Sequence, residues 1–409
     1  MRFLLLVLAL LACLLQPAAA SPPRSLRFEQ LSVEDGLAQE SILAVVQDRD
    51  GFMWFGSQSG LSRFDGYRAI NYHNETSDPH SLVNNWVRVL HVDRAGKIWI
   101  GTDGGLDRFD PDTQRFAHFA PDEPGKRGNG NRHIHAILDD GNNGLWLATA
   151  DGLQHFDIAS GTFKTWHRQA GVAGSLASDA VNALALDAGG RLWIGTSAGL
   201  DSLAPGASQF DHHALSGVDA KLNSVSALLM DATGTLWIGT QAGVETWKLA
   251  AGPAGRRRLG APEAITSGAI TVLFQDTDTT VWAGTHDDGL YRWMPQLRRF
   301  ANHRNQPSDN HSLADNFVSS IYRDRVGTFW VGTWYAGVSR VDLGSGGFTR
   351  IVKVDGAATI TDNKVRAIVD DGAGKLWLAT NDGLNRYDPL TGAASVLRHQ
   401  PGNPNSLAE

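Results

Sequence analysis

The stretch Asp93-Arg94-Ala95-Gly96-Lys97-Ile98-Trp99-Ile100-Gly101-Thr102-Asp103-Gly104-Gly105-Leu106-Asp107-Arg108-Phe109-Asp110 decides the fold, because versions of it recur along the whole chain. Each version contains one tryptophan, and successive tryptophans lie 44 to 48 residues apart. A nearly constant period of this length is the sequence signature of a repeat architecture. The repeat tryptophans are Trp54, Trp99, Trp146, Trp193, Trp237, Trp282, Trp330 and Trp377.

The rest of the repeat is as regular as its tryptophan. An aspartate lies six residues before each tryptophan, a glycine or alanine lies two residues after it, and a glycine then precedes a leucine or valine. Aspartate can hydrogen-bond the backbone of a turn and glycine can take a positive φ, so the Asp-x-x-Gly of most copies predicts a tight turn. We therefore interpret the aspartates as structural acceptors and not as catalytic carboxylates: Asp48, Asp93, Asp140, Asp187, Asp231, Asp276, Asp324 and Asp371.

Short apolar runs surround each turn. In the second copy they cover residues 86–92, 98–102, 106–110 and 115–119, and each is short and rich enough in β-branched or aromatic residues to predict a strand. Four antiparallel strands in about 46 residues make one propeller blade. The sequence therefore predicts an all-β fold, a β-propeller of four-stranded antiparallel blades, with almost no helix.

The first twenty residues predict a secretory signal peptide that is not part of the fold. Met1-Arg2 gives a basic start, residues 3–15 are apolar, and Ala18-Ala19-Ala20 suits cleavage. An uncleaved anchor and a lipoprotein signal around Cys13 are the alternatives. Because Cys13 is the only cysteine, the mature chain has no disulfide or thiol chemistry. The formal charge of −7 disfavours nucleic acid as a partner, so we expect an exported protein with another kind of partner.

The number of blades is left open by the sequence. Residues 25–36 predict a leading strand that closes a ring by pairing with the last blade. Seven repeats would then form a propeller over residues 21–354, and residues 355–409 would hold the eighth repeat and the lead-in to a ninth, in a truncated second propeller. This reading makes the sequence a fragment of a longer product. An eight-bladed ring, and a frayed terminus after the eighth repeat, are the alternatives.

Residues 93–110, residues 371–388 and the opening 28–37 resemble the two-component regulator propeller repeat family. That resemblance implies a periplasmic sensor region with two successive seven-bladed propellers, an immunoglobulin-like domain, a membrane span and a histidine kinase or diguanylate cyclase as output. The sequence contains none of the output motifs, so we expect no catalytic activity and no cofactor in this chain. The resemblance places the full-length product in the inner membrane, with a downstream kinase or cyclase module as its partner.

One candidate ligand site lies on the loops after the second strands. This loop is one residue longer in two adjacent copies, which carry His286-Asp287-Asp288 and Trp334-Tyr335-Ala336. Aromatic faces stack on sugar rings and carboxylates accept hydrogen bonds from hydroxyls, so the loops suit an oligosaccharide. The alternative is that these side chains pack between blades.

A second candidate site is formed by the residue after the first aliphatic position of each inner strand. Arg88 and Arg366 could hold a carboxylate or sulfate there, and solvated arginines are the alternative. His135 belongs to the same set, but His133 and His135 without a carboxylate motif give no metal site, and we expect none. The set is Leu43, Arg88, His135, Asn182, Ser226, Thr271, Ser319 and Arg366.

Three classes of function remain open from the sequence. A non-catalytic sensor of a small molecule, such as an oligosaccharide, accounts for the export signal, the repeats and the resemblance. An exported propeller enzyme acting on glycans would need an acid/base pair that the sequence does not single out. A protein-binding scaffold is the third class, and whether the protein forms a homodimer is not encoded in any pattern we recognise.

Overall fold

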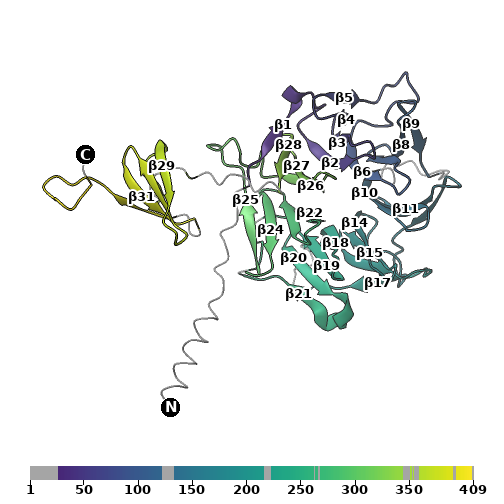
Figure 1. Cartoon of the computed structure of the whole chain (residues 1–409). Helices are drawn as coiled ribbons and strands as arrows, with labels where there is room; N and C mark the ends of the chain where they lie inside the picture. Colours follow the sequence, from purple (N-terminus) through teal and green to yellow (C-terminus); the bar gives the residue numbers. More distant parts are fainter. Residues whose placement is uncertain are drawn as a thin grey trace, which may run out of the picture. The chain divides into compact units, whose positions relative to one another are not determined.

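Every repeat folds as one small antiparallel sheet, as the spacing of the tryptophans predicts (Figure 1). The structure, a computed structural model, describes residues 26–121, 133–215, 223–261, 263–265, 268–343, 351, 353, 359–389 and 393–407. The predicted signal peptide, Cys13 and the expected boundary at Val354 lie outside these residues. The chain divides into two compact units, one formed by Leu26–Ser345 and one that contains the eighth sheet.

Blades 1 to 4 each contain four consecutive strands, ordered from the inner to the outer edge as they follow in the chain. The strands predicted for the second copy are confirmed almost residue for residue. The bounds are β2 Ile42–Gln47, β3 Met53–Ser57, β4 Gly60–Phe64 and β5 Ala69–Tyr72; β6 Val87–Val92, β7 Ile98–Thr102, β8 Leu106–Asp110 and β9 Arg115–Phe119; β10 Ile134–Asp139, β11 Gly144–Thr149, β12 Gly152–Asp157 and β13 Thr162–Trp166; β14 Val181–Leu186, β15 Leu192–Thr196, β16 Gly199–Leu203 and β17 Phe210–His213.

Blades 5 and 6 repeat this order, and blade 7 differs because its outermost strand comes from the start of the chain. The only helices among the described residues are the short 3₁₀ segments η1 Val33–Asp35 and η4 Leu249–Gly255. The strands are β18 Val225–Met230, β19 Thr235–Thr240, β20 Gly243–Lys248 and β21 Arg256–Arg258; β22 Ile270–Gln275, β23 Val281–Thr285, β24 Leu290–Met294 and β25 Arg299–His303; β26 Val318–Arg323, β27 Thr328–Thr333, β28 Val338–Asp342 and the leading β1 Glu29–Leu31; and, in the eighth sheet, β29 Val365–Asp370, β30 Leu376–Thr380, β31 Gly383–Tyr387 and β32 Ala394–Leu397.

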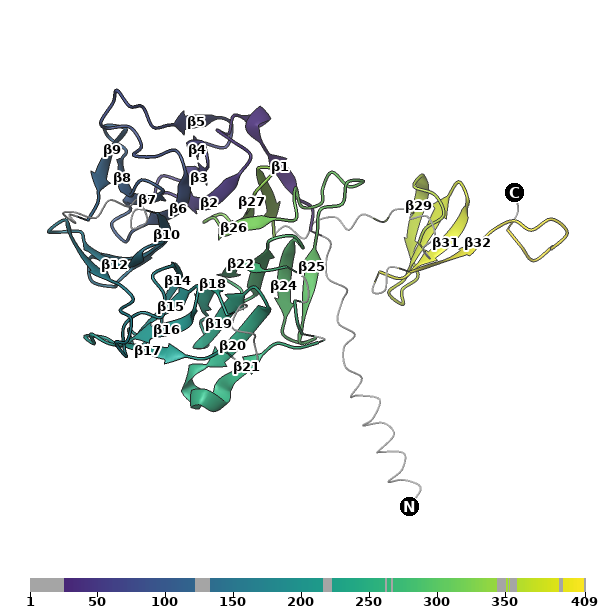
Figure 2. The same cartoon turned by 180° about the vertical axis from the view of Figure 1, so that it is seen from behind.

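The ring closes after seven blades. Strand β1 pairs antiparallel with β28, with Glu29 opposite Arg340 and Leu31 opposite Val338. The inner strands β2 and β26 are also in contact, and Figure 2 shows the seven sheets arranged around one axis. The leading strand completes the four-stranded sheet of blade 7, so that its outer edge is the three-residue strand β1. The predicted leading strand is therefore confirmed, and the eight-bladed alternative is wrong.

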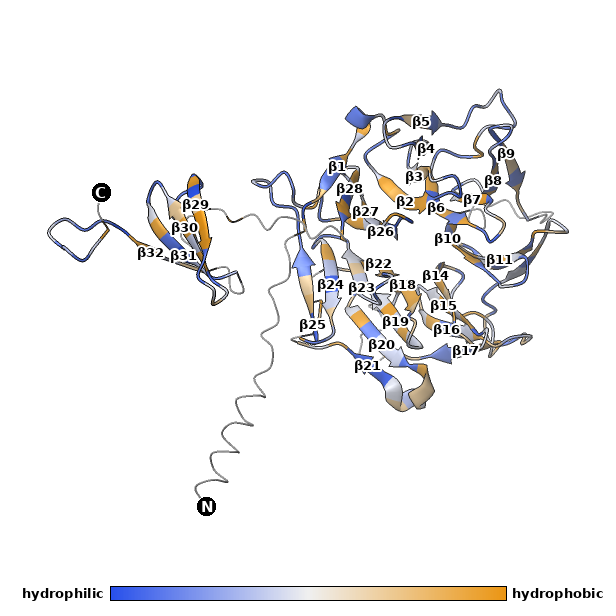
Figure 3. Ribbon diagram, viewed as in Figure 1, coloured by the Kyte–Doolittle hydropathy of each residue, from blue (hydrophilic) through white to orange (hydrophobic). Residues whose placement is uncertain are grey.

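The hydrophobic core is divided into layers that each lie between two adjacent blades. Trp54 and Leu61 of blade 1 pack against Ile100 and Phe109 of blade 2, and the ring centroids of Trp54 and Phe109 are 4.8 Å apart. Hydrophobic residues gather on inner strands such as β2 and β18, whereas the surrounding loops are hydrophilic (Figure 3). A lone blade could not bury these faces, so the ring is what provides the core.

The small residue after each tryptophan makes room for the next blade. A Cβ added at Gly56 would lie 2.6 Å from the Val87 Cγ1 atom of blade 2, and one added at Gly284 would lie 2.6 Å from Val318 Cγ1 of blade 7. These distances are well below van der Waals contact between carbon atoms. The repeat therefore keeps a small residue where one blade packs on its neighbour.

The repeated aspartate ties its turn to the tryptophan. In blade 1, Asp48 Oδ1 accepts hydrogen bonds from the backbone N–H groups of Asp50 and Phe52, and Asp48 Oδ2 accepts one from the Trp54 indole at 2.7 Å. The same indole bond forms at Trp99, Trp193, Trp237 and Trp330. These contacts support the structural interpretation of the aspartates, because both carboxylate oxygens are engaged within the blade.

Blades 3 and 6, whose turn glycine is displaced or missing, do not form this indole bond. In blade 3, Asp140 Oδ2 instead binds His155 Nε2 at 2.8 Å, and Asn143 has a φ of +123°. In blade 6, Trp282 Nε1 is buried without a partner among the described residues, and Thr279 has a φ of +66°. A positive φ strains a β-branched residue such as threonine. The departures from the repeat therefore coincide with local backbone strain.

We predict that Thr279→Gly stabilises the propeller by about 1 kcal/mol, since the relief of about 1–2 kcal/mol of left-handed strain exceeds the entropic cost of glycine. Equilibrium unfolding in urea measures the difference. The matched control is Gly234→Thr in blade 5, where the same turn position has a φ of +77° and no atom within 4 Å of an added Cβ. That exchange should destabilise by a similar amount, and a neutral or destabilising Thr279→Gly would contradict the assignment of strain.

Candidate ligand-binding site

A β-bulge sits at the second residue of every inner strand. The pairing of β2 with β3, for example, shifts register between Ile42 and Ala44 and leaves Leu43 outside the ladder. The same shift occurs at the equivalent position of β6, β10, β14, β18, β22, β26 and β29. A bulge re-aims the side chain it carries. The bulge residues are the variable set identified in the sequence, from Leu43 to Arg366.

Five bulge residues connect their blade to the next one. Asn182 Nδ2 of blade 4 donates a hydrogen bond to the Val225 carbonyl oxygen of blade 5 at 3.0 Å. The hydroxyls of Ser226, Thr271 and Ser319 donate in the same way to Ile270, Val318 and Ile42. His135 Nδ1 contacts the Val181 oxygen of blade 4 at 2.9 Å. Each acceptor is the first residue of the neighbouring inner strand, so the hub is a ring of inter-blade hydrogen bonds.

The two exceptions are Leu43 and Arg88, in blades 1 and 2. Leu43 has no donor, and Arg88 is instead paired with Asp103 of its own blade through Nε and Nη2. Other contacts join the same pairs of blades through the turns that follow the inner strands. There the Arg49 guanidinium donates a hydrogen bond to the Arg94 carbonyl oxygen, and Arg94 Nη1 donates one to the Gly141 carbonyl oxygen at 2.9 Å. Arg49 and Arg94 therefore contribute contacts at the two seams where the bulge residue makes none, and Arg325 makes a similar contact at the seam between blades 7 and 1.

A cavity of about 360 Å³ lies at this hub. Bulge residues from six blades line it, together with rim residues of blades 5, 6 and 7. The volume is within the range of small-molecule sites, which are concave and carry a few convergent polar groups. The lining residues are Leu43, Arg88, His135, Ser224, Ser226, Gln241, Ala269, Ile270, Thr271, Phe317, Ser319 and Trp334.

Stacked aromatic rings form one wall of the cavity. The rings of Phe317 and Trp334 are nearly parallel, at 8°, with centroids 4.9 Å apart. The His286 ring is tilted by 37° against Phe317 with a centroid distance of 4.2 Å, and Tyr335 meets Phe317 edge to face and is 64% exposed. Trp334 is half-buried, so part of its surface remains accessible from the cavity. Of the two long loops singled out in the sequence, the second therefore lines the cavity through Trp334, and the first contacts its Phe317 wall through His286.

Polar groups of defined donor and acceptor character face this wall. Arg88 uses Nε and Nη2 on Asp103, and its Nη1 has no hydrogen bond among the described residues. Burial lowers the pKa of His135, and the charge of Arg88 adds to this effect. The imidazole therefore stays neutral near pH 7, donates from Nδ1 to Val181 and keeps Nε2 as an acceptor.

The structure separates some residues that the sequence grouped. Asp288 is 5% exposed, accepts a hydrogen bond from the Tyr291 hydroxyl and pairs with Arg304 at 2.9 Å, and it does not line the hub cavity. Asp287 is exposed but does not line the cavity. Arg366 belongs to the unit with the eighth sheet, where its Nε donates to Asn381 at 2.9 Å.

Phe317, Gln241, Ser224 and Asp103 are functional candidates that the sequence reasoning missed. Phe317 and Ser224 each lie just before the first aliphatic residue of an inner strand. Gln241 and Asp103 each follow the Gly-Thr pair that recurs in most copies of the repeat. These positions vary among the copies in the same way as the bulge residues. Comparing the residues on both sides of each strand would have found them.

The fold and the cavity define a closed β-propeller with a ligand-sized site at its hub. The family described as two-component regulator propeller matches residues 36–59, 81–104, 175–198, 221–242 and 312–335. Five segments of the chain therefore match this family model, and the second of them overlaps the stretch 93–110 on which the resemblance was based.

Two similar solved structures are extracellular domains of bacterial signalling systems, and one curated relative is a histidine kinase. The extracellular domain of a putative hybrid two-component system from B. thetaiotaomicron is 25% identical, with a TM-score of 0.76 over 91% of this chain and 49% of that chain. The extracellular domain of a putative one-component system from the same organism is 21% identical, with a TM-score of 0.66 over 93% of this chain and 48% of that chain, and shows the same fold. Histidine kinase P4 of Formosa agariphila is 36% identical over 55 residues, which are 13% of this chain and 4% of the kinase.

These comparisons make the chain homologous to the extracellular domain of a hybrid two-component system. The chain spans about half the length of the two extracellular domains it matches. In the part of the chain that the structure describes, no helix has both the length and the apolar character needed to cross a bilayer.

Proposed function

We propose that this chain is the periplasmic ligand-sensing region of a transmembrane signalling receptor and that it has no catalytic activity of its own. The observation that carries the proposal is the hub cavity, which Trp334, Arg88 and His135 line together. The likeness to an extracellular domain of a hybrid two-component system supports the location and the role. A kinase or cyclase module downstream in the full-length product would read the state of this region.

The hydrogen-bonding character of the cavity favours an oligosaccharide. Ser226, Thr271 and Ser319 donate their hydroxyl protons to backbone carbonyls, so toward the cavity their oxygens can only accept. His135 Nε2 is also an acceptor, and Arg88 Nη1 is a donor. A polyhydroxylated ligand supplies many donors, and the apolar face of a sugar ring stacks on an aromatic side chain. The site therefore suits one sugar unit at the hub, with further units over Tyr335.

The eighth sheet is the first blade of a second propeller in this proposal. Its inner strand exposes Val365 to 36% and Ile368 to 62%, whereas the equivalent Ile42 and Val45 of blade 1 are 0% and 5% exposed. Both faces of a propeller blade are covered by neighbouring blades. The exposed apolar residues of β29 are therefore where an adjacent blade would pack.

A thermal-shift screen of the chain against neutral and uronic-acid oligosaccharides tests the proposal. A ligand that binds only the folded state raises the unfolding temperature, by an amount that grows with the logarithm of its affinity. We predict that Trp334→Ala weakens any ligand found by at least about 30-fold, because a central aromatic anchor contributes about 2 kcal/mol or more.

The matched control for this experiment is Tyr67→Ala, which removes an aromatic side chain that is 94% exposed and lies outside the cavity. This variant should bind like the unmodified chain. Both variants should unfold at nearly the same temperature without ligand, which shows that the fold is intact. A Trp334→Ala chain that retains full affinity would remove the hub cavity as the binding site.

A further inference from the structure

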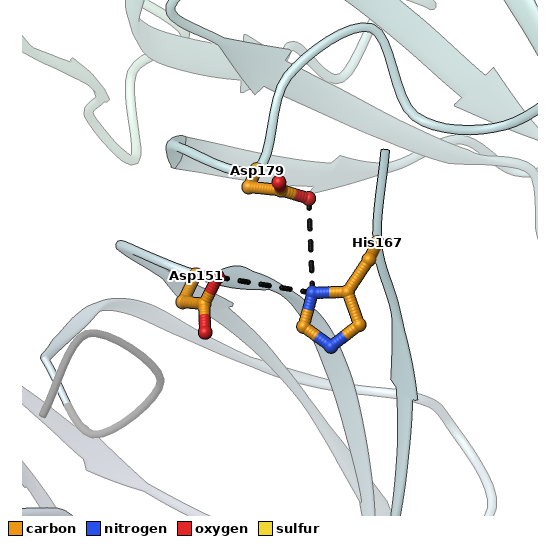
Figure 4. Close-up of side chains that lie close together, drawn as sticks. All are labelled: Asp151, His167 and Asp179. Carbon is orange, nitrogen blue, oxygen red and sulfur yellow. Dashed lines mark ion pairs between the residues drawn. The ribbon is translucent and has the colours of Figure 1, made fainter. Parts of the chain in front are cut away.

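Asp151, His167 and Asp179 converge on the edge of the ring at the seam between blades 3 and 4 (Figure 4). Asp151 precedes β12, His167 follows β13, and Asp179 lies in the lead-in to β14. His167 Nδ1 is 3.9 Å from Asp151 Oδ1 and 3.7 Å from Asp179 Oδ1. The sequence contains no short metal-binding motif here, since Asp151 and His167 are 16 positions apart and His167 and Asp179 are 12 positions apart. From this geometry we propose a binding site for a divalent transition-metal cation such as Zn²⁺ or Mn²⁺.

The separations suit three ligands of one cation. Two protein ligands at about 2.0–2.2 Å from a tetrahedral zinc ion lie about 3.3–3.6 Å apart. The two distances from His167 are close to this range, and all three ligand atoms lie within 4.8 Å of one another. A rotation of the exposed carboxylates that closes these separations by up to about 1 Å would bring all three ligands onto the same ion. Asp179 Oδ1 also accepts a hydrogen bond from the Arg168 backbone N–H at 2.6 Å, which fixes its orientation.

Charge distinguishes this cluster from the equivalent positions of other blades. In blade 6 the place of His167 is taken by Arg304, which pairs with Asp288 at 2.9 Å. In the eighth sheet Arg398 takes the same place and pairs with Asp382 at 2.8 Å. In blade 3, by contrast, neither Asp151 nor Asp179 has a lysine or arginine within ion-pair distance among the described residues. Two carboxylates here face an imidazole where blade 6 and the eighth sheet provide a guanidinium.

The ligand types decide the class of cation. An imidazole nitrogen suits Zn²⁺ and neighbouring transition metals, whereas Ca²⁺ and Mg²⁺ prefer sites made only of oxygen. Three protein ligands leave at least one coordination position for water. The side chains are 25–41% exposed, so a cation can enter from solvent. A cation bound there would cross-link blade 3 to the start of blade 4. Asp151 lies in the loop after the second strand of its blade, as do Gln241 and Trp334 of the hub cavity. The site does not depend on the proposed sugar ligand.

Calorimetric titration of the metal-stripped chain with ZnCl₂ tests this site. We expect one Zn²⁺ per chain, and a loss of affinity of more than about 100-fold in His167→Ala and Asp151→Asn. The matched control is His73→Ala, because His73 occupies the equivalent place in blade 1, next to Gly60, where Ser59 and Asn85 stand at the positions of Asp151 and Asp179. This variant should bind Zn²⁺ like the unmodified chain.

A second measurement needs no variant. Crystals of the chain soaked in ZnCl₂ should show anomalous density at the zinc edge between His167 and the two carboxylates. Undiminished Zn²⁺ binding by His167→Ala, binding of Ca²⁺ but not of Zn²⁺, or anomalous density only elsewhere would each overturn the proposal.

Discussion

Gly337→Ala is expected to open the ring of blades and to destabilise the propeller by at least about 3 kcal/mol more than a simple glycine replacement. A Cβ at Gly337 would lie 2.2 Å from the Leu31 carbonyl oxygen, so strand β1 would have to leave β28. The move would expose Phe28 and Leu31, which are 1% and 6% exposed in the closed ring. Burial of each such side chain contributes about 1.5–3 kcal/mol.

The matched control for ring opening is Gly206→Ala. Gly206 has a φ of +72°, close to the +70° of Gly337, but an added Cβ would have no atom within 4 Å. It should therefore show only the left-handed strain of about 1–2 kcal/mol. Urea unfolding of both variants isolates the contribution of closure. Equal destabilisation of the two would contradict the role of β1, and faster proteolysis near residue 30 in Gly337→Ala would support it.

The second large effect concerns acid stability and His303 on the outer strand of blade 6. Burial lowers the pKa of His303 to about 4, and the positive charge of Arg292 adds to the shift. Its Nε2 is buried without a hydrogen-bond partner among the described residues. The unfolded chain therefore takes up a proton near pH 6.5, whereas the folded chain does so only near pH 4.

The sign of this linkage gives a definite prediction. The contribution of neutral His303 to stability is complete above pH 6.5 and is lost as the pH falls from 6.5 to 4, by about 3 kcal/mol in total. His303→Phe keeps an aromatic ring beside Trp282 and removes the titrating group. The free energy of unfolding of this variant should fall by about 3 kcal/mol less across that window than that of the unmodified chain. Parallel pH profiles for the two chains would show that His303 does not titrate in this way.

The blades could be predicted from the sequence because their signals are local. The turn aspartate, the tryptophan and the small residue lie within eight positions of one another, and each contacts its own blade or the next one. The closing strand was also predictable, since residues 28–31 alternate like an outer strand. Whether seven or eight blades close was not, because curvature accumulates from packing between blades and no single residue encodes it.

The candidate site could be predicted only in part. Arg88, His135 and Trp334 were identified separately, and the ring brings them to one cavity. The ion pair of Asp288 with Arg304 could not be predicted from the sequence. Arg304 lies 16 residues later in the chain, after the outer strand of the same blade, and only the pairing of the strands brings it next to Asp288. The cluster of Asp151, His167 and Asp179 was missed for the same reason, since the hairpins of blade 3 and the lead-in to blade 4 bring its members together.

A crystal structure of the chain with an oligosaccharide identified by the thermal-shift screen would test the central claim most directly. The account predicts density for a sugar ring on the face of Trp334, with a hydroxyl or carboxylate within hydrogen-bond distance of Arg88. Density confined to another surface, such as the cavity lined by Asp93, Arg94 and Asn142, with the hub free of ligand, would contradict it.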